Sequence, residues 1–261
     1  MNYILFDDAL RINLLPFTYT RPCAAIRTGI LTISEKWERH LNTEISYLTM
    51  DYLQGKFPIY LEEENIYING RLLPDADILP DIMSLKPGQA LCLQDVVLAY
   101  NTHVSDVRQL ESAILLNSIH QIFTLNPSQI ESDFKLITKD KTSASLSATN
   151  TVIGNHPVFL EEGVKAECAI FNTTDGPIYL GFESEVMEGA IIRGPFALCE
   201  HAGVKMGAKI YSGTTVGPHS KVGGEISNSV ILGYSNKGHD GFLGNSVIGE
   251  WCNIGADSNN S

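Results

Sequence analysis

The chain lacks the features of a membrane, secreted or nucleic-acid-binding protein. No apolar run in its 261 residues approaches the length of a membrane span. The first 15 residues contain two aspartates and no basic n-region, so we expect no signal peptide. Basic residues are scarce, with 18 Lys and Arg against 30 Asp and Glu and a net charge of −12. This balance disfavours nucleic acid or an anionic membrane as the main partner but leaves small anionic substrates open.

Cysteine is sparse as well. The five cysteines are scattered along the chain and form no C-x-x-C pair. Metal and redox roles are therefore disfavoured, and we expect no metal ligands and a cytoplasmic location.

What the chain does have is a six-residue repeat over residues 180–227. Its first position is aliphatic eight times in succession, at Leu180, Val186, Ile192, Leu198, Val204, Ile210, Val216 and Val222. This period is typical of a parallel β-helix of the hexapeptide type, in which residues eighteen apart stack on neighbouring coils, about 4.8 Å apart. A β-sandwich is disfavoured because its strands alternate with a period of two. We predict a left-handed parallel β-helix over residues 152–261.

The first 138 residues predict an α/β domain. Short apolar stretches such as residues 3–6 and 45–48 are strand-like, and Thr32 and Glu35 have capping-box spacing before a helix. Asn69-Gly70 between apolar residues predicts a hairpin. We expect further helices at about residues 106–116 and 128–134. The polar segment 139–151 is predicted to be a linker.

The hexads lose their phase between Val222 and Phe242. These two residues are twenty apart, two more than three hexads, so we expect extra residues to bulge from the wall within residues 233–241. Loops that interrupt a solenoid are where chemistry is usually placed. His239 lies in this segment, and imidazole suits proton removal near neutral pH.

The residues around His239 resemble the acetyltransferase half of the GlmU family. The matching stretches are Lys237-Gly-His239-Asp-Gly-Phe242-Leu-Gly244, Val247-Ile-Gly249 and Asn253-Ile-Gly-Ala256, against H-x-x-Y-L-G, I-G and N-I-G-A-G-T in the family. The resemblance implies that His239 is the general base for N-acetylation of glucosamine 1-phosphate by acetyl-CoA. It places Asn253 at the sugar or beside His239, and Ala256 near the thioester.

Lys237 is then expected to contact the sugar phosphate. Two residues depart from the family pattern: Phe242 replaces tyrosine, which removes one hydrogen bond to the substrate, and Asp257 replaces glycine. The resemblance also implies a homotrimer. The chain stops at Ser261 in the middle of a coil, so we expect a β-helix that is truncated at its C-terminus or capped by its neighbours.

Residues 15–29 resemble the opening of sugar-phosphate nucleotidyltransferases. In that family a G-x-G-T-R loop, which wraps a triphosphate, precedes a segment P-L-T-x-x-R-P-K. This chain keeps Arg21-Pro22, but Cys23 replaces the lysine and residues 6–11 (FDDALR) replace the glycine-rich loop. The resemblance implies an anion clamp of Arg21 and Arg27, although each arginine has a surface ion pair as its alternative. It implies Asp95 as a counterpart of the metal-binding aspartate, with Mg²⁺ if this half is active.

A column of Glu183, His201 and His219, eighteen residues apart, is predicted to stack on one outer face of the β-helix. Zinc hydrolases of the γ-carbonic-anhydrase type also carry histidines on such a helix, and these side chains are acceptable zinc ligands. The spacing differs from the closer histidine pair of that family, and a solvated column is the alternative.

The resemblances together predict a transferase of UDP-N-acetylglucosamine or related sugar-nucleotide synthesis that binds a sugar phosphate, a nucleotide and acetyl-CoA. The alternative is a catalytically inactive sugar-nucleotide-binding or scaffolding module. The missing glycine-rich loop favours this alternative for the N-terminal half.

Overall fold

The computed structural model describes residues 2–260, which form two compact units. Unit 1 comprises Met1–Ile26 and Leu31–Ile119, and unit 2 comprises Arg27–Ile30 and His120–Ser261. No helix of the described residues is long and apolar enough to span a membrane.

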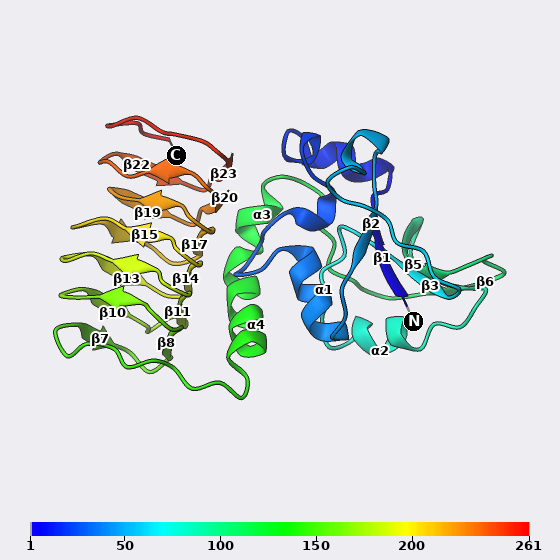
Figure 1. The fold of residues 1–261 in the computed structure, drawn as a ribbon, viewed down its shortest axis with the longest axis horizontal. Helices are drawn as coiled ribbons and strands as arrows, with labels where there is room; N and C mark the ends of the chain where they lie inside the picture. The colour runs from blue at the N-terminus through cyan, green and yellow to red at the C-terminus, as the bar shows by residue number, and fades with distance from the viewer. Residues whose placement is uncertain (1, 261) are drawn as a thin grey trace. The chain divides into compact units, whose positions relative to one another are not determined.

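Unit 1 is built on a six-stranded mixed sheet with the strand order β2-β1-β3-β5-β4-β6 (Figure 1). Its strands are β1 (Asn2–Phe6), β2 (Ser46–Leu48), β3 (Asn65–Asn69), β4 (Gln89–Leu93), β5 (Val96–Asn101) and β6 (Asp106–Gln109). β1 pairs in parallel with both β2 and β3, whereas β5 runs antiparallel to its neighbours β3 and β4. The carboxyl ends of β1, β2, β3 and β4 therefore lie along one edge of the sheet.

The helices of unit 1 are short. They are α1 (Ile33–Leu41), α2 (Ile78–Met83) and the 3₁₀ helices η1 (Ala9–Leu14), η2 (Phe17–Tyr19), η3 (Cys23–Ala25) and η4 (Asp51–Leu53). α1 begins with the predicted capping box, in which Thr32 and Glu35 bond each other's backbone N–H. The predicted helix at residues 106–116 is wrong, because this segment begins with the exposed edge strand β6, which pairs with β4.

The predicted hairpin at Asn69-Gly70 is also wrong. A tight hairpin needs positive φ in its turn, and neither residue has it. β3 is instead held between β1 and β5, and the Gly70 N–H donates to the carbonyl of Phe6 at 2.8 Å. The Asn-Gly pair thus ends a central strand and leads into Arg71.

Unit 2 is a left-handed parallel β-helix, which confirms the predicted fold. Figure 1 shows its strands stacked as a ladder. One wall contains β7 (Thr151–Ile153), β10 (Ile170–Asn172), β13 (Ile191–Arg193), β16 (Lys209–Ile210), β19 (Glu225–Ser227) and β22 (Phe242–Gly244). The second contains β8 (Val158–Leu160), β11 (Ile178–Leu180), β14 (Phe196–Leu198), β17 (Thr214–Val216), β20 (Val230–Gly233) and β23 (Val247–Glu250). The third contains β9 (Lys165–Ala166), β12 (Glu185–Val186), β15 (Gly203–Val204), β18 (Lys221–Val222) and β21 (Asn236–Lys237).

The hexad aliphatics face the interior of the β-helix. Leu180 pairs with Leu198, and Val186 with Val204, so the register is the predicted eighteen residues. All of the hexad aliphatics from Leu180 to Val222 are buried in one apolar cluster. This burial is the main source of stability for a wall whose strands are only two to four residues long.

Unit 2 also includes α3 (Gln121–Thr124) and α4 (Asn126–Thr138), and α4 packs on β14 and β17. Asn126 of α4 binds the segment 27–30 through a 2.6 Å hydrogen bond from the Gly29 N–H to its Oδ1. Thr215 of β17 donates to the carbonyl of Gly29 at 2.9 Å. The compact units therefore divide the chain differently from the expected boundary at residue 138, because α4 and residues 27–30 are fixed to the β-helix by buried polar contacts.

The phase change of the β-helix arises from two shortened corners, one between Val222 and Ile226 and a second between Ile226 and Ile231. Val204, Val222 and Lys237 are paired in register, as are residues 209, 225 and 242 on the next wall. The corners between these walls contain four residues in 205–208, two in 223–224 and four in 238–241. The predicted bulge within residues 233–241 is therefore wrong, because 238–241 has the same length as the corner two coils below.

Candidate functional site

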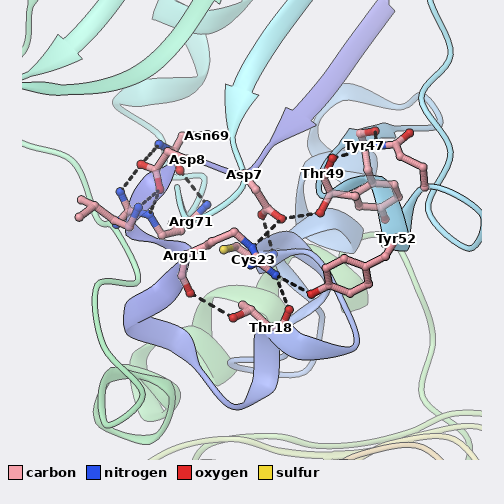
Figure 2. A network of polar contacts seen from close by, with 12 residues as sticks. Asp7, Asp8, Arg11, Thr18, Cys23, Tyr47, Thr49, Tyr52, Asn69 and Arg71 are labelled. Carbon is pink, nitrogen blue, oxygen red and sulfur yellow. Dashed lines mark hydrogen bonds and ion pairs between the residues drawn. The ribbon is translucent and has the colours of Figure 1, made fainter.

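In unit 1, polar side chains gather where the parallel strands end (Figure 2). Asp7 and Asp8 follow β1, Thr49 follows β2, and Asn69 and Arg71 lie at the end of β3. β1 lies between β2 and β3, so the chain runs from β1 to its neighbour β2 on one side and then crosses to β3 on the other side. Ligands of open α/β sheets bind outside the carboxyl ends of strands at such a reversal. This edge is the candidate site of unit 1.

Asp8 and Arg71 form a bidentate ion pair at this edge. The Nε and Nη2 atoms of Arg71 donate to the two carboxylate oxygens of Asp8 at 3.0 and 2.5 Å. The Nδ2 of Asn69 donates to the same carboxylate at 2.9 Å, and the Leu10 N–H at 3.1 Å. Burial alone would raise the pKa of Asp8, but the hydrogen bonds from Arg71 and Asn69 and the Arg71 charge hold it below its ordinary value. The Nη1 of Arg71 donates to Asn117.

Asp7 is held by a second set of donors. Its carboxylate accepts hydrogen bonds from the Cys23 N–H at 2.8 Å and the Thr49 hydroxyl at 2.6 Å, and lies 3.5 Å from Arg11 Nε. Burial, reinforced by Asp7, raises the pKa of the Cys23 thiol, so this cysteine is not an activated nucleophile. Arg11 also contacts Tyr52, with 3.4 Å between Nη2 and the phenol oxygen.

These contacts do not fit a magnesium site. Both carboxylates of the loop are already bound by donors of the protein. Across residues 2–260, no group of three or more His, Cys, Asp or Glu side chains is arranged to hold a metal ion. Asp95 lies exposed in the turn between β4 and β5, at the same edge of the sheet.

The two arginines of the predicted anion clamp lie in different compact units. Arg21 is buried in unit 1. Arg27 is buried in unit 2, where its guanidinium donates to the carbonyl of Ile30 and lies 3.9 Å from the sulfur of Cys199.

In unit 2, His239 lies on the four-residue corner above the shortened corner 223–224. The side chain of His239 is exposed. A hollow of about 260 Å³ lies at this corner; His239 itself does not line it, but the next residue, Asp240, does. Lys209, Asp240 and Phe242 are among its lining residues, and Gly224 contributes to its floor. A Cβ on Gly224, whose φ is +74°, would lie 2.7 Å from the carbonyl oxygen of Gly241.

Lys237 anchors this corner from inside the β-helix. It is 3% exposed and occupies an inward position that is aliphatic in the coils below. Its Nζ donates to the carbonyls of Gly223, His239 and Asp240 at 3.3, 2.6 and 3.3 Å. Burial lowers the pKa of Lys237, and the charges of Asp240 and Asp257 partly offset this effect. The buried ammonium is thus bound by backbone carbonyls of the two adjacent corners.

The other predicted ligands of unit 2 are dispersed around the corner. Phe242 is half-buried, and Leu243 rather than Phe242 continues the inward row. Asn253 is exposed and accepts a hydrogen bond from Asn236 at 3.1 Å. Ala256 is exposed in the last coil. Phe242 lines the hollow, but Asn253 and Ala256 do not.

The predicted column of Glu183, His201 and His219 does form. His201 Nδ1 lies 3.4 Å from Glu183, and the two imidazole rings stack with centroids 4.7 Å apart. Tyr234 and Trp251 extend the stack at 5.0 and 4.7 Å. Rings that stack face to face cannot direct their nitrogens at one metal ion, so this column is an exposed aromatic stack.

The sequence pattern missed the Asp8–Arg71 pair and the anchoring role of Lys237. Asp8 and Arg71 are 63 residues apart, and the Asn-Gly pair before Arg71 had predicted a hairpin. The two-residue corner was detectable, because Gly223-Gly224 lies where the hexad phase changes.

The α/β unit with polar side chains at its parallel strand ends, followed by a left-handed β-helix, defines a transferase of the nucleotidyltransferase-like class. The family model described as sugar nucleotidyl transferase matches residues 3–142, more than half of the chain. The chain therefore belongs to the sugar nucleotidyl transferase family. A comparison with curated proteins finds no match.

Proposed function

We propose that the chain acts in the synthesis of UDP-N-acetylglucosamine or a related sugar nucleotide, and that unit 2 acetylates glucosamine 1-phosphate with acetyl-CoA. The observation that carries this proposal is the place of His239: an exposed imidazole on a corner that Lys237 anchors and whose next residues, Asp240 and Gly241, line a hollow of about 260 Å³. Family membership supports chemistry on activated sugars. The proposal includes a homotrimer in the cytoplasm.

In the proposed reaction, His239 accepts a proton from the 2-amino group while the nitrogen attacks the thioester carbonyl. A C–N bond forms and the C–S bond breaks, so coenzyme A leaves as its thiol after protonation. A backbone N–H at the corner stabilises the oxyanion of the tetrahedral intermediate. The carbonyl of His239 is fixed by Lys237 at 2.6 Å, which leaves the imidazole as the mobile part of this residue.

A second function is favoured for unit 1, namely sugar-nucleotide binding without nucleotidyl transfer. Its observation is the Asp8–Arg71 pair: a cation and a carboxylate at the strand ends neutralise each other, so neither is free to take part in transfer from a bound nucleotide. Binding of UDP-N-acetylglucosamine without turnover of UTP supports this function. UTP turnover with glucosamine 1-phosphate or its N-acetyl form contradicts it.

The acyltransferase proposal is tested with His239→Ala. Acetyl-CoA and glucosamine 1-phosphate are supplied, and both free thiol and N-acetylated product are measured. Loss of a general base lowers the rate by about 10²–10⁴-fold. His156→Ala is the matched control, because His156 is another exposed histidine of unit 2. An unchanged rate in His239→Ala, or no acetylated product from the unmodified protein, refutes the proposal.

A further inference from the structure

Arg71 is a cation that unit 1 buries completely. Its side chain has an exposed fraction of 0%, whereas the side chain of its partner Asp8 is 20% exposed. A buried guanidinium must be matched by an anion, because an unpaired charge in the interior is costly. Asp8 therefore lies on the solvent side of Arg71 and closes off its charged edge.

Four donors converge on the Asp8 carboxylate. They are the Nε and Nη2 of Arg71, the Nδ2 of Asn69 and the Leu10 N–H, at distances between 2.5 and 3.1 Å. The fork of an arginine side chain matches carboxylate and phosphate oxygens equally well, and backbone N–H groups bind either. The same four groups could therefore donate to two oxygens of a phosphate group.

Asp8 comes from the loop between β1 and η1, whereas Asn69 and Arg71 come from the end of β3. Asn69 is itself fixed, because its Nδ2 also donates to the carbonyl of Val97 at 3.0 Å, and its Oδ1 accepts from the Arg71 N–H at 3.0 Å. The amide of Asn69 is thus held by the sheet independently of Asp8, and the guanidinium of Arg71 is also held by the hydrogen bond from its Nη1 to Asn117. The carboxylate is the part of the arrangement that a solvent-exposed loop supplies.

We propose that Arg71, Asn69 and the Leu10 N–H form a receptor for a phosphate-type oxyanion, and that Asp8 is its built-in occupant. Unit 1 then keeps this receptor closed to free phosphate compounds. The inference concerns unit 1 alone and is independent of acyl transfer at His239.

The test is chemical complementation of Asp8→Ala by inorganic phosphate. Thermal unfolding is followed by tryptophan fluorescence in a Trp251→Phe background, so that Trp37 reports unit 1 alone. Sodium phosphate is compared with sodium chloride at equal ionic strength. Asp8→Ala should unfold at a lower temperature than the parent in chloride. Phosphate should then raise its midpoint by about 5 °C for each tenfold increase above the Kd.

Two further proteins make the result specific. The parent with Asp8 intact should show no phosphate-dependent rise, because its receptor is filled. Asp8→Ala combined with Arg71→Met should also show none, because the fork is gone. The proposal is overturned if phosphate stabilises Asp8→Ala no more than chloride does, or stabilises the parent or the double variant equally well. If Asp8→Ala does not fold in either salt, Asp8→Ser, which keeps an N-cap oxygen for η1 but is too short to fill the receptor, decides by the same criteria.

Discussion

Replacement of Lys237 by methionine removes one ammonium and leaves the inward position filled. Each hydrogen bond from a charged donor contributes about 1.5–3 kcal/mol, but burying the ammonium costs several kcal/mol. Of the three carbonyls that Lys237 binds, those of His239 and Asp240 belong to exposed residues and can bind water instead. Only the Gly223 carbonyl comes from a buried residue. An unsatisfied buried acceptor costs about 1–3 kcal/mol, so we expect Lys237→Met to lower the free energy of unfolding by about 1–2 kcal/mol.

The effect of Lys237→Met on the local opening of the corner should be larger than its effect on the global free energy of unfolding. With its anchor gone, the segment 238–241 should lose hydrogen-exchange protection, while β18 and β21 remain protected. Acetyl transfer should fall if His239 acts as proposed, because its backbone would no longer be fixed. Denaturant unfolding and hydrogen exchange measured by mass spectrometry check both points. A loss of more than about 4 kcal/mol, or unchanged protection of 238–241, refutes this account of Lys237.

The contribution of Lys237 to the stability of the fold should change with pH in a definite direction. Burial lowers the pKa of Lys237 in the folded state, so between that pKa and the ordinary value the unfolded chain binds more protons. Stability contributed by this group therefore rises with pH through that window. The free energy of unfolding of the unmodified protein, measured relative to that of Lys237→Met, should increase as the pH rises through this window. A difference between the two proteins that falls or stays constant contradicts the assigned shift.

The two tryptophans separate the two units spectroscopically. Trp37 is fully buried in unit 1, and Trp251 is 77% exposed in unit 2. The fluorescence of Trp251→Phe should therefore be blue-shifted and poorly quenched by acrylamide. Red-shifted emission from this variant contradicts the placement of Trp37. Gly224→Ala should destabilise unit 2 by about 1–3 kcal/mol, because φ is +74° and the new Cβ meets backbone oxygen at 2.7 Å. Gly207→Ala, with φ +67° and no atom within 4 Å, is the control and should cost less in denaturant unfolding.

The hexad repeat predicted the β-helix because its cause is local and repeated. Every sixth residue faces the interior, so burial alone imposes an aliphatic at each such position. The same reasoning failed after Val222, because shortened corners place the next inward residues at Ile226 and Ile231 instead of at six-residue intervals. One coil above Val222, the inward residue is Lys237. The hydropathy of a lysine does not indicate that its side chain is buried. The carbonyl groups that accept hydrogen bonds from Lys237 come together only in the folded coil. Hexad spacing therefore predicts Phe242 as the inward residue, whereas the structure has Leu243 there.

In unit 1, local signals predicted local structure and little else. The capping box at Thr32 and Glu35 needs only four neighbouring residues, and it begins α1 as predicted. The Asn-Gly pair has turn propensity, but pairing of β3 with strands on both sides overrides it. The ion pair between Asp8 and Arg71 depends on that sheet topology. Two acidic residues, Asp7 and Asp8, stand where the family has its glycine-rich loop, and the structure shows both carboxylates bound by donors of the protein.

Arg71 and Lys237 are both buried cations, but they differ in what neutralises them. Lys237 is surrounded by backbone carbonyls, which no substitution removes and no ligand displaces without opening the corner. Arg71 depends on one side chain, Asp8, from a loop that solvent reaches. Once that carboxylate is removed, as in Asp8→Ala, an external oxyanion can take its place, because the donors of Arg71 and Asn69 remain. The chemistry of the partner, rather than the burial of the cation, therefore makes Lys237 a structural anchor and Arg71 a candidate ligand-binding residue.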